Sequence, residues 1–169
     1  LGCNQKIMKR GSNMYFESYR PQLIQDVMDF YIQSHDRQFT KTPEDNIKLA
    51  ELDNERCPTL VYNDRQQCIA FFTLHFGEGI KPYTTNEQAV FFRSFGVDAR
   101  YRNLGIGTAV IQALPQYIHE QFPMITEIYL AVNDTNEQAQ RLYERCGYQY
   151  CGEGELEDKR VYILKQIIT

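Results

Sequence analysis

One segment past the middle of the chain combines an arginine and two glycines at close spacing, and this combination could bind a phosphate group. The segment reads Arg102-Asn103-Leu104-Gly105-Ile106-Gly107-Thr108, with an aromatic strand pattern before it and an amphipathic helix pattern after it. The unpaired N–H groups and the positive dipole of a helix N-terminus form an anion site. Glycines let a phosphate lie against the backbone, and an arginine adds a forked donor.

Two familiar nucleotide-binding loops do not fit this segment. A nucleoside-triphosphate loop requires Lys followed by Ser or Thr after its last glycine, whereas Thr108 and Ala109 follow Gly107. A dinucleotide fingerprint requires three glycines near the start of a βαβ unit and an acidic residue about 20 residues later. A purely structural turn between a strand and a helix is equally compatible with the segment in isolation.

Hydrophobic periodicity and turn residues predict the elements that position this segment. Strands are expected at residues 14–19, 59–62, 68–76, 88–97, 127–132, 148–151 and 159–166. Helices are expected over residues 21–35 and 42–54, and helical apolar faces mark residues 106–117 and 139–146. Pro115 is expected to kink the third helix, and the acidic residues 153–158 connect the last two strands.

The composition indicates a globular chain without a nucleic-acid or membrane partner. The chain has 169 residues and a net charge of −4, whereas nucleic-acid surfaces are basic. No apolar run approaches the ~20 residues of a membrane span. Five cysteines without a CxxC pair indicate reduced thiols, a cytoplasmic location and no metal site. Residues 1–13 are expected to be a flexible or non-native segment before a single domain at 14–169.

Two motifs connect the chain to a known family. The first is residues 97–107, with the spacing Arg-x-x-Gly-x-Gly, and the second is residues 130–148, with Asn136, Ala139, Leu142-Tyr143 and Gly147-Tyr148. Both motifs resemble those of the GNAT superfamily of N-acetyltransferases, and the order of predicted elements resembles that fold. The resemblance implies a mixed α/β (α+β-like) architecture. Its mostly antiparallel sheet contains a splayed pair of parallel strands and is flanked by about four helices.

The resemblance implies that acetyl-CoA is the cosubstrate and places it along the first motif. The pantetheine arm is expected between two parallel strands that end near Val97 and Val132, and the pyrophosphate at the N–H groups of the loop. A backbone N–H in the splayed strand would polarise the thioester carbonyl. The cofactor-binding residues implied are Phe95, Val97, Arg102, Asn103, Leu104, Gly105, Ile106, Gly107, Thr108 and Asn136.

The catalytic residue that the resemblance implies is Tyr143, acting as the general acid for the departing CoA thiolate. A phenol and a thiol have pKa values close enough for this proton transfer. The alternative is that Tyr143 is an ordinary buried aromatic residue on the apolar face of its helix. Asn136 is expected to cap the same helix on either interpretation.

The general base and the acceptor are left open by the sequence. Residues 88–96 lack the carboxylate that family members often carry, which leaves Glu87, His75, Glu78 or water as the base. An amine-bearing acceptor is implied, and residues 153–158 form either a wall that attracts cations or a solvated hairpin tip. A homodimer is left open, because the acyl-CoA site needs no second chain. The alternative function is a catalytically idle acyl-CoA-binding sensor module.

Overall fold

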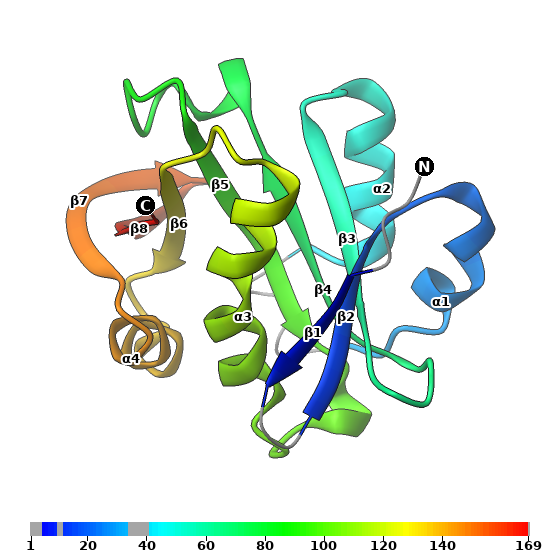
Figure 1. Cartoon of the computed structure of the whole chain (residues 1–169). Coiled ribbons are helices and arrows are strands. Elements are labelled where there is room, and N and C mark those ends of the chain that lie inside the picture. Colours follow the sequence, from blue (N-terminus) through cyan, green and yellow to red (C-terminus); the bar gives the residue numbers. More distant parts are fainter. Residues whose placement is uncertain (1–4, 10–11, 34–40, 169) are drawn as a thin grey trace.

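Eight strands form one mixed sheet in the computed structural model, which describes residues 5–9, 12–33 and 41–168. Their order across the sheet is β1-β2-β3-β4-β5-β6-β8-β7 (Figure 1). The strands are β1 (Gln5–Lys9), β2 (Ser12–Ser18), β3 (Arg56–Tyr62), β4 (Cys68–His75), β5 (Ala89–Val97), β6 (Glu127–Asn133), β7 (Gln149–Leu156) and β8 (Lys159–Ile167). Neighbours pair antiparallel except for β5 and β6, which pair parallel. The expected mixed, mostly antiparallel sheet is confirmed.

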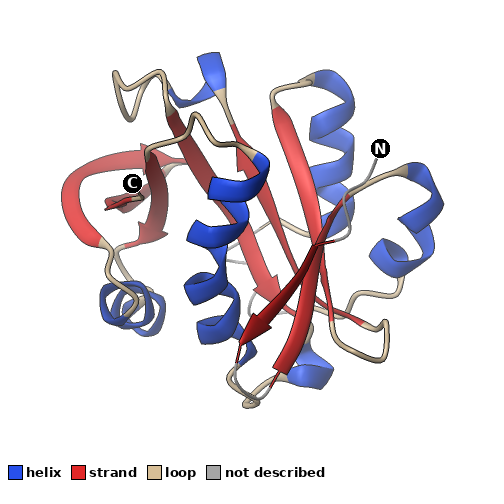
Figure 2. Cartoon of the chain, viewed as in Figure 1, coloured by secondary structure: helices blue, strands red, loops and turns tan. Residues whose placement is uncertain are grey.

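Helices cover both faces of this sheet (Figure 2). The helix α3 (Ile106–Gln121) packs on one face through buried residues such as Val110 and Leu114. The opposite face of β3 and β4 is covered by α1 (Ile24–Met28) and α2 (Pro43–Leu52), through Val27 and Ile47. We call these two sides the α3 face and the α2 face. The fourth helix, α4 (Glu137–Arg145), follows β6. The described part of the chain also contains the short 3₁₀ turns η1 (Pro21–Leu23), η3 (Gly77–Ile80) and η4 (Ala99–Tyr101).

Local signals explain where α2 and α3 begin. The Thr42 hydroxyl accepts from the Asp45 N–H at 3.2 Å, and the Asp45 carboxylate accepts from the Thr42 N–H at 3.3 Å. This reciprocal capping box, with Pro43 in the first turn, starts α2 as the sequence predicts. Pro115 lies inside α3, and the helix nevertheless continues to Gln121. Within the described residues, no helix is long and apolar enough to cross a membrane.

The helix predicted over residues 21–35 is much shorter in the structure, because α1 ends at Met28. Its apolar face is only partly buried: Val27 is 4% exposed, whereas Ile24 and Met28 are 43% and 55% exposed. The backbone of Tyr31 bonds elsewhere: its N–H donates to Asp98 at 3.0 Å, and its carbonyl accepts from the Ala99 N–H at 2.9 Å. The end of the predicted helix, including its last residue His35, lies outside the described residues.

Both edge strands differ from the prediction. At one edge, β1 pairs antiparallel with β2, in a segment for which no strand is predicted. At the other edge, β7 extends to Leu156, so Glu153 lies within a strand, and only Glu157 and Asp158 form the turn. Both turn residues have positive φ angles, 53° and 62°. Polar and charged sequences suit exposed edge strands, and they lack the apolar alternation that predicts a buried strand.

Candidate active site

The parallel strands β5 and β6 separate partway along their length. Their last paired residues are Phe92 and Leu130. Beyond that pair, β5 continues beside β4 to Val97, and β6 continues beside β8 to Asn133. The residues of β5 are buried up to Phe92 and partly exposed from residue 93 to residue 97. We call these diverging ends, residues 93–97 and 131–133, the splay. Its backbone groups on the facing sides have no partner in the β5–β6 ladder.

A β-bulge distorts β5 inside the splay. Thr73 of β4 lies opposite Arg93, and Phe71 lies opposite Gly96, so β5 contains an extra residue in this interval. Ser94 takes up the distortion with a φ angle of 57°, which costs a residue with a side chain about 1–2 kcal/mol. Strained backbone of this kind is concentrated at functional sites. The bulge re-aims main-chain donors next to Phe95, at the place where the sequence predicts contacts with pantetheine.

The N-terminus of α3 offers an open anion site. Gly105 caps the helix with a φ angle of 74°, and a Cβ atom added there would meet no other atom within 4 Å. The first intrahelical bond comes from the Ala109 N–H to the Gly105 carbonyl, which leaves the preceding N–H groups available. Arg102 and Leu104 are exposed beside this turn. The residues present therefore fit a diphosphate, because room and donors coincide.

The same turn packs against β5 and α4 on its other side. A Cβ atom added to Gly107 would lie 3.8 Å from Leu142 Cδ2, 3.9 Å from Val97 Cγ2 and 4.0 Å from Phe95 Cε1. The two sequence motifs are therefore in contact in the folded chain, although they are separate in the sequence. This contact places α4, the helix of the second motif, beside the start of α3.

A buried aspartate that sequence reasoning did not single out anchors the chain between β5 and α3. Asp98 is fully buried and accepts from the Tyr31 N–H at 3.0 Å and the Arg100 N–H at 2.9 Å. The Arg100 guanidinium donates to it at 2.7 Å and 3.0 Å. Burial alone would raise the pKa of Asp98, but these donors outweigh it and hold the pKa below its usual value. This clamp fixes η4, which leads into the loop.

Tyr143 lies at the buried side of α4. Its ring meets that of Tyr148 edge to face, with centroids 5.6 Å apart. Burial raises the pKa of Tyr143, with a smaller contribution from Cys146. The phenol therefore stays protonated at neutral pH, as a general acid requires. Tyr143 follows Leu142, the residue nearest Gly107, so this turn of α4 lies at the end of the sheet that contains the loop.

Asn136 caps α4 as predicted. Its Oδ1 atom accepts from the Ala139 N–H at 3.2 Å. The side chain of Gln140 supports the same turn by donating to the carbonyls of Asn133 at 2.9 Å and Asp134 at 3.1 Å. These bonds order the turn that connects β6, one arm of the splay, to the helix that carries Tyr143.

His75 is a buried residue in a partly buried network that the sequence did not reveal. Its Nδ1 atom lies 3.0 Å from Arg93 Nε, and its Nε2 atom lies 3.0 Å from Asp53 Oδ2. Arginine can only donate, so Nδ1 accepts and Nε2 carries the proton that is donated to Asp53. Burial, then the charges of Arg93 and Arg56, lower the pKa of His75 and keep it neutral.

The network bears on the choice of general base. Both ring nitrogens of His75 are already engaged, so this residue offers no lone pair to an incoming amine. Glu78 is exposed and lies 2.6 Å from Lys81, and Glu87 is exposed as well. Among the described residues, no group of three His, Cys, Asp or Glu side chains could hold a metal ion.

A mixed sheet that opens between two parallel strands, beside a helix N-terminus with room for a diphosphate, is the architecture of an acyl-CoA-dependent transferase. The family comparison agrees: residues 21–148 match the model of the acetyltransferase (GNAT) family. The chain belongs to this family and is an N-acetyltransferase. The family uses acetyl-CoA as acetyl donor.

Related sequences and structures are consistent with this assignment. The chain is 28% identical over 131 residues to the uncharacterized N-acetyltransferase YbbJ of Bacillus subtilis strain 168, covering 77% of this chain and 81% of that protein. It is 34% identical over 74 residues to a spermine/spermidine N(1)-acetyltransferase of the same strain, covering 44% of this chain and 48% of that protein. A crystal structure of the aminoglycoside acetyltransferase AAC(6')-Ib with coenzyme A and kanamycin shares the fold, with a TM-score of 0.75, 16% identity, and coverage of 91% of this chain and 94% of that one.

Proposed function

We propose that this chain transfers an acetyl group from acetyl-CoA to a primary amine by direct attack in a ternary complex. The observation that carries the proposal is the separation of β5 and β6 after Phe92 and Leu130, beside the open helix N-terminus at Gly105. The main-chain groups of the splay could bind the extended pantetheine arm of acetyl-CoA. The positive dipole at the N-terminus of α3 could bind its phosphates. We take residues 14–169 to act as one acyltransferase domain.

The residues that would hold acetyl-CoA follow from this geometry. Backbone N–H groups of residues 103–108 and the side chain of Arg102 would bind the pyrophosphate, and main-chain groups of Phe95 and Val97 would bind the pantetheine. The open space at Gly105 fits this assignment, because a side chain there would occupy the place of the phosphate. Asn136 would act indirectly, by ordering the turn between β6 and α4.

Bound acetyl-CoA would supply an activated thioester carbonyl. The N–H groups re-aimed by the bulge at Ser94 would polarise the carbonyl oxygen, and one preorganised donor of this kind contributes about 10²–10³ in rate. The acceptor must attack as an uncharged amine. Tyr143 would then give its phenolic proton to the departing sulfur. Because His75 is engaged on both nitrogens, we infer that the amine loses its proton to water or arrives neutral.

Release of CoA thiol in the presence of an amine panel tests this function. Wild type should release thiol only when a suitable amine is added, whereas a sensor would bind acetyl-CoA without turnover. Tyr143→Phe keeps the ring and its contact with Tyr148 but removes the acidic proton. Its kcat should fall by about 10²–10⁴, while the affinity for acetyl-CoA should stay that of wild type. A fall below threefold would assign Tyr143 to packing alone.

The acceptor panel should begin with polyamines and aminoglycosides, because relatives in sequence and fold carry those names. The acidic residues near the last hairpin give limited support to a purely cationic acceptor. Glu153 pairs with Arg160 at 2.6 Å, and Glu157 pairs with Lys41. Each of these carboxylates is therefore already partnered by a basic side chain. A cytoplasmic location and a homodimer stay predictions.

A further inference from the structure

Arg93 occupies the point where the two parallel strands begin to separate. It is the first residue of β5 beyond the last pair, Phe92 and Leu130. Side chains alternate along a strand, so Arg93 lies on the α2 face with Phe91, away from α3. The residue of β6 that follows Leu130 is Ala131, which has a small side chain. If acetyl-CoA enters the splay as proposed above, its acetyl group must end close to Arg93.

The guanidinium of Arg93 is held in a fixed position. Its Nε atom donates to His75 Nδ1 at 3.0 Å, and its central carbon lies 4.3 Å from the centroid of the Phe91 ring. Asp53 orients His75 in turn, at 3.0 Å. The close passage of η3 completes the packing, because a Cβ atom added to Gly79 would lie only 2.1 Å from the imidazole. Tyr83 also forms a side-chain hydrogen bond with this guanidinium. Because arginine has five N–H donors, N–H groups of the terminal nitrogens are left for another partner.

No carboxylate among the described residues forms an ion pair with Arg93. The two acidic side chains that act near this cluster have other partners. Asp53 binds His75 at 3.0 Å and Arg56 at 3.4 Å, and Glu157 pairs with Lys41. Burial lowers the pKa of Arg93, while Tyr83 beside it favours the charged form, and a guanidinium stays charged in any case. A partly buried cation without a counterion is unfavourable, and a bound anion would relieve this cost.

We propose that Arg93 binds a carboxylate of the acceptor, so that the acceptor is an amino acid or another amine that carries a carboxylate near its reacting nitrogen. The planar fork of arginine matches a carboxylate with two parallel hydrogen bonds. Because Arg93 lies at the start of the splay, a carboxylate bound to it would lie near the thioester. This inference rests on the proposed function. A simple polyamine would instead bring a second cation against Arg93 and bind poorly.

Matched pairs of acceptors test the proposal. Each amino acid is compared with its own amide, which lacks only the negative charge, by measuring kcat/KM from thiol release. The amine of the amide is less basic than that of the acid, so a larger fraction of it is uncharged and able to attack. This difference alone would favour the amide over the acid. Wild type should nevertheless prefer the acid by about 10- to 100-fold, the usual size of a charge-assisted contact.

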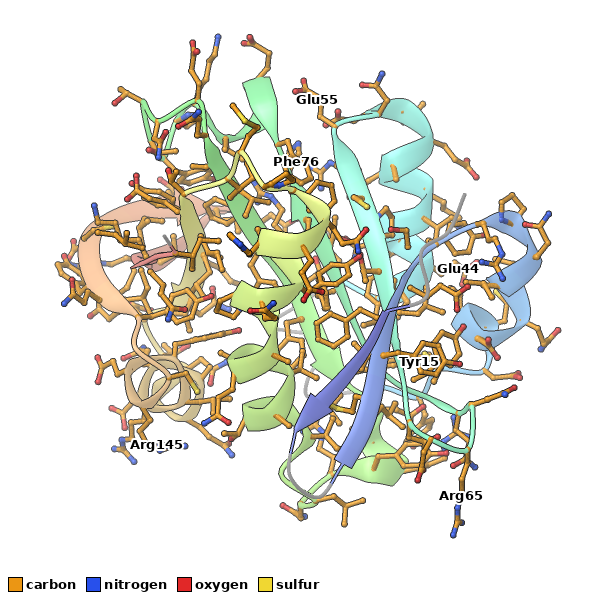
Figure 3. All side chains as sticks on the ribbon, in the orientation of Figure 1. Tyr15, Glu44, Glu55, Arg65, Phe76 and Arg145 are labelled. Carbon is orange, nitrogen blue, oxygen red and sulfur yellow. The ribbon has the colours of Figure 1, made fainter. Side chains whose placement is uncertain are left out.

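Variants of Arg93 show whether this residue causes the preference. Arg93→Gln should raise KM for the acid and bring acid and amide to similar kcat/KM values. Arg93→Met, which keeps the apolar stem on Phe91, should give the same result if Arg93→Gln is unstable. Arg65→Gln is the matched control: Arg65 is exposed in the turn between β3 and β4, and its side chain extends away from the ribbon (Figure 3). This control should keep the wild-type preference.

A binding measurement separates this inference from the proposed function. Calorimetry with CoA-saturated wild type should detect an N-acetylamino acid, and the affinity should drop about 10- to 100-fold for its amide or for Arg93→Gln. Equal use of acids and amides by the wild type, or a preference that survives in Arg93→Gln and Arg93→Met, would overturn the role of Arg93. If no amine releases thiol and CoA itself does not bind, the proposed function fails, and the proposal for Arg93 fails with it.

Discussion

Two glycines in the same loop should respond to alanine in opposite ways, and the difference tests the assignment of the phosphate site. Gly105 has a φ angle of 74°, a region in which a residue with a Cβ atom is destabilised by about 1–2 kcal/mol. For a domain of this length, that loss corresponds to a fall in Tm of about 2–8 °C in Gly105→Ala. Gly107 lies in the first turn of α3, where alanine contributes about 0.5–1 kcal/mol over glycine. Its added methyl group would meet only ordinary contacts at 3.8–4.0 Å.

The two variants should also differ in their binding of CoA. The methyl group of Gly105→Ala would point into open space, where we place the pyrophosphate, and so would displace a charge-assisted contact. Such a contact contributes about 1.5–3 kcal/mol, so the Kd for CoA should rise about 10- to 100-fold. The methyl group of Gly107→Ala would point toward Leu142, Val97 and Phe95, away from the phosphates, and the Kd should stay close to that of wild type.

Differential scanning calorimetry and isothermal titration calorimetry measure these effects on the same preparations. We expect Gly105→Ala to melt lower and bind CoA weakly, and Gly107→Ala to melt at or above the wild-type temperature and bind normally. Folded Gly105→Ala with an unchanged Kd would refute the phosphate assignment. A large loss of stability in Gly107→Ala would refute the packing described for the start of α3.

Three further predictions concern buried polar groups. Asp98→Asn should lower stability at pH 7 by about 1–3 kcal/mol, because the hydrogen bonds to the buried carboxylate weaken. The folded state lowers the pKa of Asp98 below its ordinary 3.8, so this stability is present above pH 3.8 and is lost as the pH falls below it. Free energies of unfolding from urea titrations should therefore converge for wild type and variant in acid. The lowered pKa of His75 predicts that wild type loses stability as the pH falls below 6.5, the ordinary value for histidine, and that His75→Gln loses this part of the pH dependence. The Tyr148 hydroxyl is buried without a hydrogen-bond partner among the described residues, so Tyr148→Phe should raise stability by about 1 kcal/mol, or about 2–4 °C in Tm.

Each of these predictions has a result that contradicts it. Parallel stability curves for wild type and Asp98→Asn down to pH 2 would show that Asp98 is not held ionised by the fold. An unchanged pH profile in His75→Gln would mean that another group titrates between neutrality and acid. A lower Tm for Tyr148→Phe would indicate a partner for the hydroxyl, such as an ordered water molecule.

Elements with local signals could be predicted from the sequence. Thr42 and Asp45 form the predicted capping box, and Gly147 ends α4 with a φ angle of 97°. The loop before α3 was predicted because its glycines and arginine are adjacent in the sequence. The helix over residues 21–35 is predicted too long, because apolar residues recur there at helical spacing. The fold nevertheless leaves Ile24 and Met28 exposed.

Contacts that depend on strand register could not be predicted. His75 contacts Arg93, 18 positions away in the sequence, and Asp53, 22 positions away. These contacts depend on the β4–β5 register and on the course of the chain after α2. Asp98 meets Tyr31 across 67 positions. One signal in the sequence could have indicated a site: Arg93 is a charged residue within an otherwise aromatic strand that leads into the loop.

The most direct test of the central claim is a calorimetric titration of the chain with acetyl-CoA, with NAD titrated under the same conditions as the comparison. If the splay and the N-terminus of α3 form the donor site, acetyl-CoA and CoA should each bind at one saturable site, and NAD should bind far more weakly. Addition of acetyl-CoA should also raise the Tm with concentration. Binding of NAD without binding of acetyl-CoA or CoA would contradict the account.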